Sequence, residues 1–284
     1  MTQEQAKVWQ AWDVQGIELL QATFITHSFP KHFHESYGIG LSDQGSGIIY
    51  CEGTKHVAPP SQLIFFHPGQ VHSGYANEQA AWTYRMIYLD VAVVVEILEG
   101  YTSTVSFPET TFCNPVIATV FTATHSRFSQ SASTLEREAL LQNFVRLLYQ
   151  QAKRQPWTER VVYDSRAVRL VREYLEANYQ ENVSIRTLAD LTCLSPNYLV
   201  TAFRREVGLP PHQYQTQVRV QRAKADLQTQ KFLAQVAIDA GFCDQSHFNR
   251  CFKRLVGVTP RNYRDSNFIQ DRSLSQIGRL MSRV

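Results

Sequence analysis

Three histidines in the N-terminal half have the residue type and spacing of a binding site. His32 and His34 lie two residues apart, so their side chains share one face if the segment is extended. His72 follows a Pro68-Gly69 turn further along the chain. Neutral imidazoles can ligate zinc, iron or nickel, hydrogen-bond a small ligand, or hydrogen-bond the surrounding protein. All three alternatives stay open, and we expect the histidines to bind an effector in preference to a metal.

The C-terminal half carries a second set of residues, whose chemistry suits double-stranded DNA. Amide, hydroxyl and guanidinium groups can read the edges of bases, and flexible cations can contact phosphates. Arg250 is the strongest candidate for contacting a guanine. The expected base contacts are Asn197, Val200, Thr201, Ser246, Asn249 and Arg250. The expected phosphate contacts are Arg204, Arg205, Lys253 and Arg254.

Two short helices joined by a tight turn must position these residues, and residues 234–264 have that pattern. Gly241 stands where a first helix should stop, and Asp244 can cap the next helix. In that second helix Phe248 and Phe252 fall on one face at helical spacing, opposite the polar residues named above. This is the layout of a helix-turn-helix DNA reader.

The pattern occurs twice in the chain. Residues between Ser195 and Tyr214 match residues between Asp244 and Tyr263 in their roles as cap, core, cation, stop and helix start, at a shift of 49. In the first helix of each unit the shift is 48, which predicts a longer second turn. A repeat with matched roles is hard to obtain by chance. Two such units on one chain can enter successive major grooves about 34 Å apart.

Charge divides the chain near the same place. The net charge is +3, but residues 1–155 carry 9 Lys and Arg against 13 Asp and Glu, whereas residues 156–284 carry 19 against 12. The basic part therefore contains the repeat, as binding to phosphates requires. No apolar run approaches the ~20 residues of a membrane span, and the N-terminus lacks the pattern of a signal peptide. We expect a cytoplasmic protein with no membrane partner.

Short β-prone runs separated by turn residues fill the N-terminal half. The expected strands are 19–24, 37–41, 47–51, 63–66 and 81–89. This spacing predicts a small barrel or jelly roll. Along the last run Trp82, Tyr84, Met86 and Tyr88 alternate, so we expect Trp82, Tyr84 and Tyr88 to bind the effector together with the histidines. The opposite register would turn Arg85 inward to hold a carboxylate.

Helical periodicity follows the strands. The expected helices are 114–128, 133–154, 166–179, 184–193 and 212–228, with a polar linker at 150–160. The apolar stripe of the second of these helices is wide enough both to pack on the barrel and to join two subunits. We therefore expect an effector-binding and dimerisation domain over residues 1–155, a DNA-binding domain over 156–265 and a C-terminal tail over 266–284.

The repeat contains the segments SIRTLADLTCLSPNYLVTAFRREVGLPPHQY at 184–214 and VAIDAGFCDQSHFNRCFKRLVGVTPRNYR at 236–264. These two segments resemble the AraC/XylS family of transcription regulators. The histidine segments resemble the two motifs of a cupin, the sensing barrel often found at the front of such regulators. Metal-binding cupins carry a glutamate four or five residues past the second histidine, where this chain has Gly38 and Ile39. This departure argues against a metal cofactor.

The resemblance implies a two-domain fold, with a cupin-like β-barrel or jelly roll followed by helices and then an all-α domain that contains two helix-turn-helix units. It implies a sequence-specific activator of transcription and no enzymatic activity. The implied partners are double-stranded DNA, a small-molecule effector such as an amino acid or organic acid, a second copy of the chain, and RNA polymerase. The alternative is a metal-dependent cupin enzyme fused to a DNA-binding module. A DNA-repair role would need a metal-held set of cysteines that the sequence lacks.

Overall fold

The computed structural model of the chain describes residues 3–11, 13–77, 80–99, 105–107, 109–130, 132–154 and 165–266. The described residues divide into a β-rich unit up to residue 154 and a helical unit from residue 165. Strand β3 (Ser28–His32) is paired in a β-sheet and belongs to the β-rich unit. Most of the predicted linker, and the predicted tail after Ser266, lie outside the described residues.

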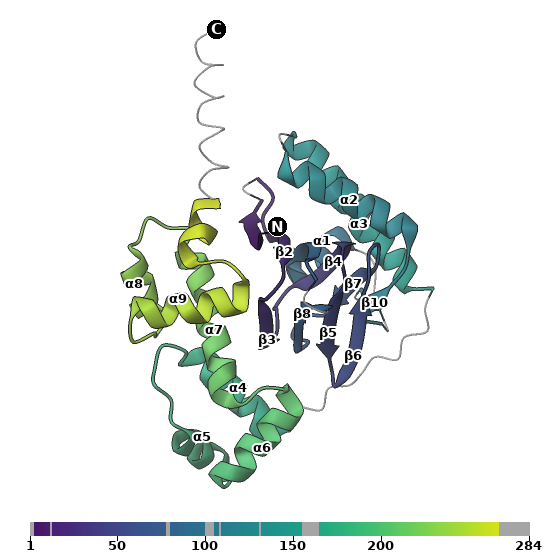
Figure 1. Cartoon of the computed structure of the whole chain (residues 1–284). Helices are drawn as coiled ribbons and strands as arrows, with labels where there is room; N and C mark the ends of the chain where they lie inside the picture. Colours follow the sequence, from purple (N-terminus) through teal and green to yellow (C-terminus); the bar gives the residue numbers. More distant parts are fainter. Residues whose placement is uncertain are drawn as a thin grey trace. The chain divides into compact units, whose positions relative to one another are not determined.

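Two sheets form the β-rich unit (Figure 1). The six-stranded sheet has the order β1 (Gln5–Gln10), β2 (Ile17–Phe24), β9 (Trp82–Leu89), β4 (Tyr37–Gln44), β7 (Leu63–Phe66) and β10 (Thr111–Phe112). The four-stranded sheet has the order β3, β8 (His72–Ala76), β5 (Gly47–Cys51) and β6 (Thr54–Ala58). The predicted β-rich N-terminal domain is confirmed.

Strand β9 lies inside the larger sheet and is buried on both faces. Trp82, Tyr84 and Met86 share the face that meets the smaller sheet. The Trp82 ring covers Gly47 of β5 so closely that an added Cβ would lie 2.4 Å from it. Ile87 points to the opposite face, where it packs in a core shared with helices. Alternation of side chains along this strand therefore separates an inner layer between the sheets from an outer layer.

Helices α2 (Pro115–Ser129) and α3 (Thr134–Ala152) supply most of that outer core, and the shorter α1 (Val91–Ile97) precedes them. Asn114 caps α2 by accepting the N–H of Ile117, and Ser133 caps α3. The two helices lie side by side (Figure 1). The core that they share with the larger sheet includes Leu19, Ile39, Ile87, Phe121, Phe144 and Leu148. The α3 stripe packs in this common core, chiefly against α1 and α2, and its role in dimerisation stays a prediction.

A buried ion pair ties α3 to the segment between β1 and β2. Arg137 Nη1 lies 2.7 Å from Asp13 Oδ1, and the two side chains are 7% and 3% exposed. Thr134 donates a hydrogen bond to the other Asp13 oxygen, and Arg137 donates to the carbonyl of Gln130. These additional bonds satisfy charges that would be costly to bury alone.

The residues before β2 form part of the larger sheet. They form edge strand β1, which pairs antiparallel with β2, and Trp9 stands opposite Leu19. Trp9 is 1% exposed, and its ring meets the His125 ring edge-on at 5.5 Å. Burial of this large side chain explains why the segment joins the sheet.

His125 of α2 should make the stability of the β-rich unit depend on pH. It is 2% exposed, and its Nε2 donates to the carbonyl of Leu20 at 3.2 Å. Burial lowers the pKa of His125 to about 4, and the nearby Arg85 contributes in the same direction. The Leu20 hydrogen bond opposes this shift. The folded state therefore disfavours the imidazolium form.

We predict that acid weakens this unit through His125. The unfolded chain binds the proton with a pKa near 6.5, so the stabilisation is fully present above that pH and is lost as the pH falls toward about 4. Across this interval the wild type should lose about 3 kcal/mol of unfolding free energy that His125→Gln retains. Urea unfolding of both proteins between pH 7 and 4 measures the difference in their unfolding free energies. The other titrating groups are the same in both proteins, so their contributions drop out of this difference. Parallel pH curves for the two proteins would contradict the prediction.

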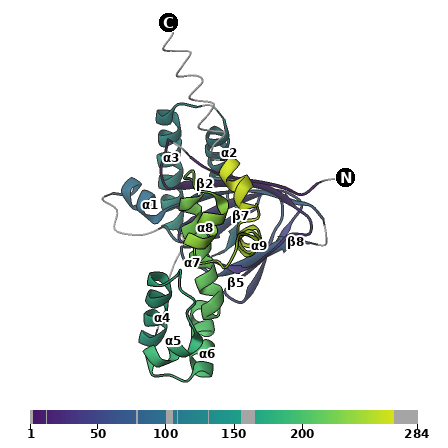
Figure 2. The same ribbon diagram turned by 90° about the vertical axis from the view of Figure 1, so that its left-hand side faces the viewer.

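The helical unit contains α4 (Arg166–Ala177), α5 (Ile185–Thr192), α6 (Pro196–Val207), α7 (Pro211–Asp226), α8 (Leu233–Asp239) and α9 (Gln245–Val256), and residues 260–266 are also helical. Helix α7 runs between α4, α5 and α6 at one end and α8 and α9 at the other (Figures 1 and 2). The predicted long connecting helix is therefore confirmed.

The loop between α4 and α5 holds the two ends of the helical unit together. Arg219 of α7 donates from Nε to the carbonyl of Tyr179 at 2.7 Å. Gln180 donates from Nε2 to the carbonyl of Asp239, the last residue of α8, at 2.7 Å. Gly241 has φ +84°, and a Cβ there would lie 2.7 Å from the Gln180 backbone. Only glycine suits both this conformation and this approach. One loop therefore bonds to both α7 and α8.

Candidate DNA interface and effector site

The two helix-turn-helix units repeat each other in structure. Helices α6 and α9 have equal lengths and lie 49 residues apart, and α8 begins 48 residues after α5. Ser195 and Asp244 cap α6 and α9 with their side chains, and Gly208 and Gly257 end them with φ +85° and +86°. The N–H of His247 donates to Asp244 at 2.7 Å and holds the pKa of that carboxyl below its usual range. Local capping therefore determines where α6 and α9 begin and end. These two helices carry the predicted base contacts and are called the reading helices.

The turns that precede these helices differ in length. Residues 193–195 join α5 to α6, whereas residues 240–244 join α8 to α9. Cys193 takes the left-handed conformation in the first turn with φ 54°, and Gly241 does so in the second. The longer second turn that the sequence shift predicted is confirmed.

The buried apolar faces of α6 and α9 determine the orientation of their polar faces. Leu199 and Phe203 of α6, and Phe248 and Phe252 of α9, are each 0% exposed. Phe252 packs edge-on against Tyr263, with ring centroids 5.4 Å apart. With one face of each helix locked in the core, its polar face is held in a fixed orientation.

Most of the predicted base-reading side chains lie on the exposed faces of α6 and α9. The exposed members are Asn197, Thr201, Ser246 and Arg250. Thr201 donates from Oγ1 to the carbonyl of Asn197, one turn earlier on α6. Val200 and Asn249 are half-buried, and Asn249 Oδ1 is buried without a hydrogen-bond partner. Arg250 and Ser246 are therefore more accessible to a bound DNA than Asn249 is.

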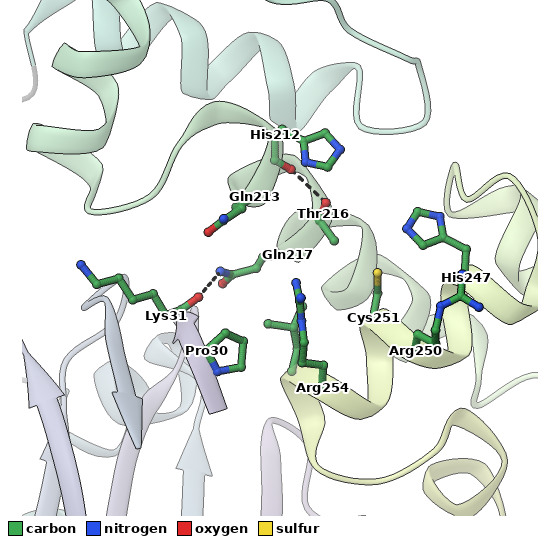
Figure 3. Close-up of a pocket in the computed structure, with 11 residues that line it drawn as sticks. Pro30, Lys31, His212, Gln213, Thr216, Gln217, His247, Arg250, Cys251 and Arg254 are labelled. Atoms are coloured by element: carbon green, nitrogen blue, oxygen red, sulfur yellow. Dashed lines mark hydrogen bonds between the residues drawn. The ribbon is translucent and has the colours of Figure 1, made fainter. Parts of the chain in front are cut away.

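The predicted phosphate contacts are the exposed cations at the ends of the reading helices: Arg204, Arg205, Lys253 and Arg254. Cations in a last helical turn also favour the negative end of the helix dipole. Arg205 donates to Glu206 at 2.9 Å; the Arg205 side chain is exposed, whereas that of Glu206 is largely buried. Figure 3 shows Arg250 and Arg254 projecting from α9 together with His247.

Tyr198 is a candidate DNA contact that the sequence argument missed. It follows Asn197 at the start of α6 and is 56% exposed despite its aromatic ring. A phenol on such a face can donate to a phosphate or contact a base. Tyr198 precedes the buried Leu199 and therefore falls off the apolar face, which was the available signal in the sequence.

In the β-rich unit the structure brings His32, His34 and His72 together. One ring nitrogen of each lies within 4.8 Å of the others, although forty residues separate the first from the last. His32 ends β3 and His72 begins β8, and these strands are neighbours in the smaller sheet. His34 lies in the following loop, where its carbonyl accepts the N–H of Gly69 at 2.7 Å. Sheet pairing and the Pro68-Gly69 turn therefore assemble the cluster.

Aromatic rings surround this cluster unevenly. Tyr88 has its ring centroid 4.6 Å from that of His34, as the predicted effector site requires. Phe66, which the sequence argument did not select, stacks on His72 at 3.6 Å with an interplanar angle of 9°. Trp82 and Tyr84 stack on each other at 4.1 Å and are both buried. These last two act as core between the sheets.

Arg85 does not have the alternative inward register. It donates from Nε and Nη2 to the Asp43 carboxylate at 2.8 and 2.7 Å, and its guanidinium lies 5.7 Å from the Phe121 ring of α2. Arg85 therefore faces the helices, away from the inner layer that holds Trp82. The interpretation of Arg85 as a pocket cation was wrong because its partner Asp43 lies on the neighbouring strand β4.

Known domains match both units. The sequence model of the AraC-like ligand binding domain matches residues 14–145, and that of a helix-turn-helix domain matches residues 188–266. An uncharacterized HTH-type transcriptional regulator, YbfI of Bacillus subtilis, is 28% identical over 81% of this chain and 85% of its own length. The arabinose operon regulatory protein of Escherichia coli is 25% identical over 81% of this chain and 80% of its own. These matches span both units.

A third relative and a solved structure are also similar. The bifunctional transcriptional activator/DNA repair enzyme AdaA of Bacillus subtilis is 31% identical, over 45% of this chain and 61% of its own length. The crystal structure of ToxT from Vibrio cholerae with a bound unsaturated fatty acid has a TM-score of 0.58 and 14% identity, and covers 92% of this chain and 95% of ToxT. At this identity the likeness shows a shared fold.

In the described part of the chain, no helix is long and apolar enough to cross a membrane.

Proposed function

The chain belongs to the AraC family of DNA-binding transcription regulators, with an N-terminal ligand-binding domain and a C-terminal helix-turn-helix domain, and on that premise we propose that it activates transcription when an effector binds near its histidine cluster. The observation that carries the proposal is the structural repeat of α6 and α9, each capped, packed and ended in the same way. Each helix would enter one major groove of double-stranded DNA.

Base reading is assigned to Asn197, Val200, Thr201, Ser246, Asn249 and Arg250, and phosphate binding to Arg204, Arg205, Lys253 and Arg254. Arg250 carries most of the expected discrimination because a guanidinium can bond a guanine edge at two points. Lys253 presents a single flexible ammonium group and adds affinity without reading sequence.

We predict that Arg250→Ala loses sequence preference. Discrimination between the selected DNA site and random DNA should fall by about 1–3 kcal/mol, roughly 5- to 150-fold, because the guanine contact is lost. The selected site is first obtained from a random-sequence library with the wild-type chain. Fluorescence anisotropy at fixed salt concentration then gives both affinities for each variant.

Lys253→Ala is the matched control, since it removes an exposed cation one turn further along α9. It should weaken binding to both DNAs by a similar factor and reduce the salt dependence of binding by about one charge. If Arg250→Ala behaves like this control, the base-reading role of Arg250 is refuted.

The effector site is assigned to the β-rich unit and includes His32, His34, His72 and Tyr88. Trp82 and Tyr84, the other predicted contacts, are buried and would act through packing. Imidazole and phenol groups suit an amino acid or an organic acid. The fatty acid found in ToxT is also an acid, which fits this class.

The remaining assignments concern domains and partners. The proposed domains are residues 1–155 for effector binding and dimerisation, 156–265 for DNA binding and 266–284 as a tail. The broad apolar face of α3 is proposed to contribute to a homodimer, and activation implies a contact with RNA polymerase. The regulator acts on DNA, so its proposed location is the cytoplasm.

We propose that the chain is a regulator and no enzyme. The relatives that cover most of its length are transcription regulators, and AdaA, which combines regulation with repair, shares less than half of it. Within the described residues, the only cluster of three potential metal ligands consists of histidines and includes no cysteine. This composition does not match the cysteine set expected for DNA repair.

A further inference from the structure

Three imidazoles converge where β3 and β8 are neighbours. The ring nitrogens that His32, His34 and His72 offer lie within 4.8 Å of one another. Nitrogens bound to one tetrahedral ion at about 2.0–2.1 Å lie about 3.3 Å apart, so modest side-chain rotations would close the set. We propose that this site binds one divalent transition-metal ion such as zinc, cobalt or nickel, with all three histidines as ligands.

The backbone fixes which nitrogen two of the rings offer. His32 Nδ1 lies 2.9 Å from the carbonyl oxygen of Pro30, and His72 Nδ1 lies 2.9 Å from that of Gln70. A carbonyl oxygen only accepts, so in the neutral ring each Nδ1 carries the proton and Nε2 carries the lone pair. A metal-binding histidine usually donates its second N–H in this manner, which orients the ring and increases its basicity.

Packing holds the ligands in place. His72 is buried against the Phe66 ring, and His34 lies between the rings of His72 and Tyr88, at centroid distances of 5.3 and 4.6 Å. His32 is also buried. Side chains held by rings and backbone bonds lose little freedom on binding an ion, which favours affinity.

The ligand set is neutral, and this constrains what else binds. Gly38 stands four residues after His34, so the cluster has no carboxylate at that position, and a Cβ there would lie 3.3 Å from the Phe66 ring. Three imidazoles leave both a coordination position and the charge of a dication unsatisfied. An anion is therefore the favoured fourth ligand. Resting on the proposed sensor function, this step assigns the effector as a carboxylate that binds the metal directly.

Cobalt(II) tests the site because its visible absorption reports its coordination. The untagged full-length chain is stripped with chelator, dialysed and titrated with Co²⁺. We expect saturation at one equivalent per chain. His34→Ala and His72→Ala should each weaken binding by about 100-fold or more, because loss of an outer-shell partner alone commonly costs 10- to 100-fold. His56→Ala is the control, since His56 is half-buried on β6 in the same unit and lies outside the cluster. It should bind as the wild type does.

Absence of saturable binding to the wild type, or equal binding by the two cluster variants, overturns the proposal. Circular dichroism checks their folding, and His34→Gln and His72→Gln replace any alanine variant that does not fold. DNA affinity is measured on the same samples. A wild type that binds its selected DNA but no Co²⁺ refutes the metal site and leaves the regulator intact, whereas one that binds Co²⁺ but no DNA supports the metal site and refutes the regulator.

Discussion

Phe252→Ala should lower the free energy of unfolding of the helical unit by about 3–5 kcal/mol and abolish selective DNA binding. Phe252 is 0% exposed and packs edge-on against both Phe248 and Tyr263, at 5.5 and 5.4 Å. Its removal leaves a cavity at the contact between α9 and the helical residues 260–266. A domain is commonly stable by only 5–15 kcal/mol, so this loss is a large share of the total.

Urea unfolding followed by circular dichroism measures the change, and anisotropy with the selected site measures the loss of binding. Phe232→Ala is the control, because Phe232 is 84% exposed at the start of α8. Its effect should stay within about 0.5 kcal/mol. Equal stability of the two variants would show that Phe252 does not hold α9 in the core.

Arg137→Met should cost the β-rich unit about 3–5 kcal/mol of unfolding free energy. The substitution keeps an apolar side chain of similar length but leaves the Asp13 carboxylate buried without its cation. Thr134 still donates to Asp13, which compensates only part of the charge. Thermal and urea unfolding of the full chain measure the loss.

Two comparisons separate burial from charge. Arg127→Met breaks the pair with Glu136, whose side chains are 49% and 44% exposed, and should cost at most about 1 kcal/mol. The double variant Asp13→Leu with Arg137→Met removes both buried charges and should recover much of the loss. If Arg127→Met and Arg137→Met are equally stable, burial does not set the strength of the Asp13 pair.

The helical unit could be predicted from the sequence because its signals are local. Ser195 and Asp244 each cap a helix that begins at the next residue, and Gly208 and Gly257 each end one. Capping and glycine conformations act within a few residues, so a linear reading detects them. The longer second turn followed from the change of shift between repeats for the same reason.

The strands were predicted only where the sheet buries them. The runs that became β2, β4, β5, β7 and β9 are largely apolar and lie mostly inside their sheets. Of the missed strands, β1, β3, β6 and β10 lie at sheet edges, whereas β8 lies inside the smaller sheet. Strand β3 also contains Pro30, which an edge tolerates because one side of the strand needs no ladder bond. Edge strands depend on partners that a linear pattern does not reveal.

The candidate effector site was predicted in its residues but not in its geometry. His32 and His34 share a local spacing, whereas the approach of His72 depends on the pairing of β3 with β8. Arg85 shows the same limit, because its partner Asp43 is 42 residues away and lies beyond the strand predicted at 37–41. Contacts between distant segments decide these side-chain roles.

The loop between α4 and α5 has a consequence for promoters. Because it bonds to Arg219 of α7 and to the end of α8, the two reading helices keep a fixed separation and rotation. One base pair inserted between the two contacted stretches displaces them by about 3.4 Å and rotates them by about 35° about the DNA axis. The protein can follow such an insertion only by breaking those bonds. Under the proposed mode of DNA binding, regulated promoters must preserve the helical phase between the two stretches, and a single insertion there weakens binding although the contacted bases are all intact.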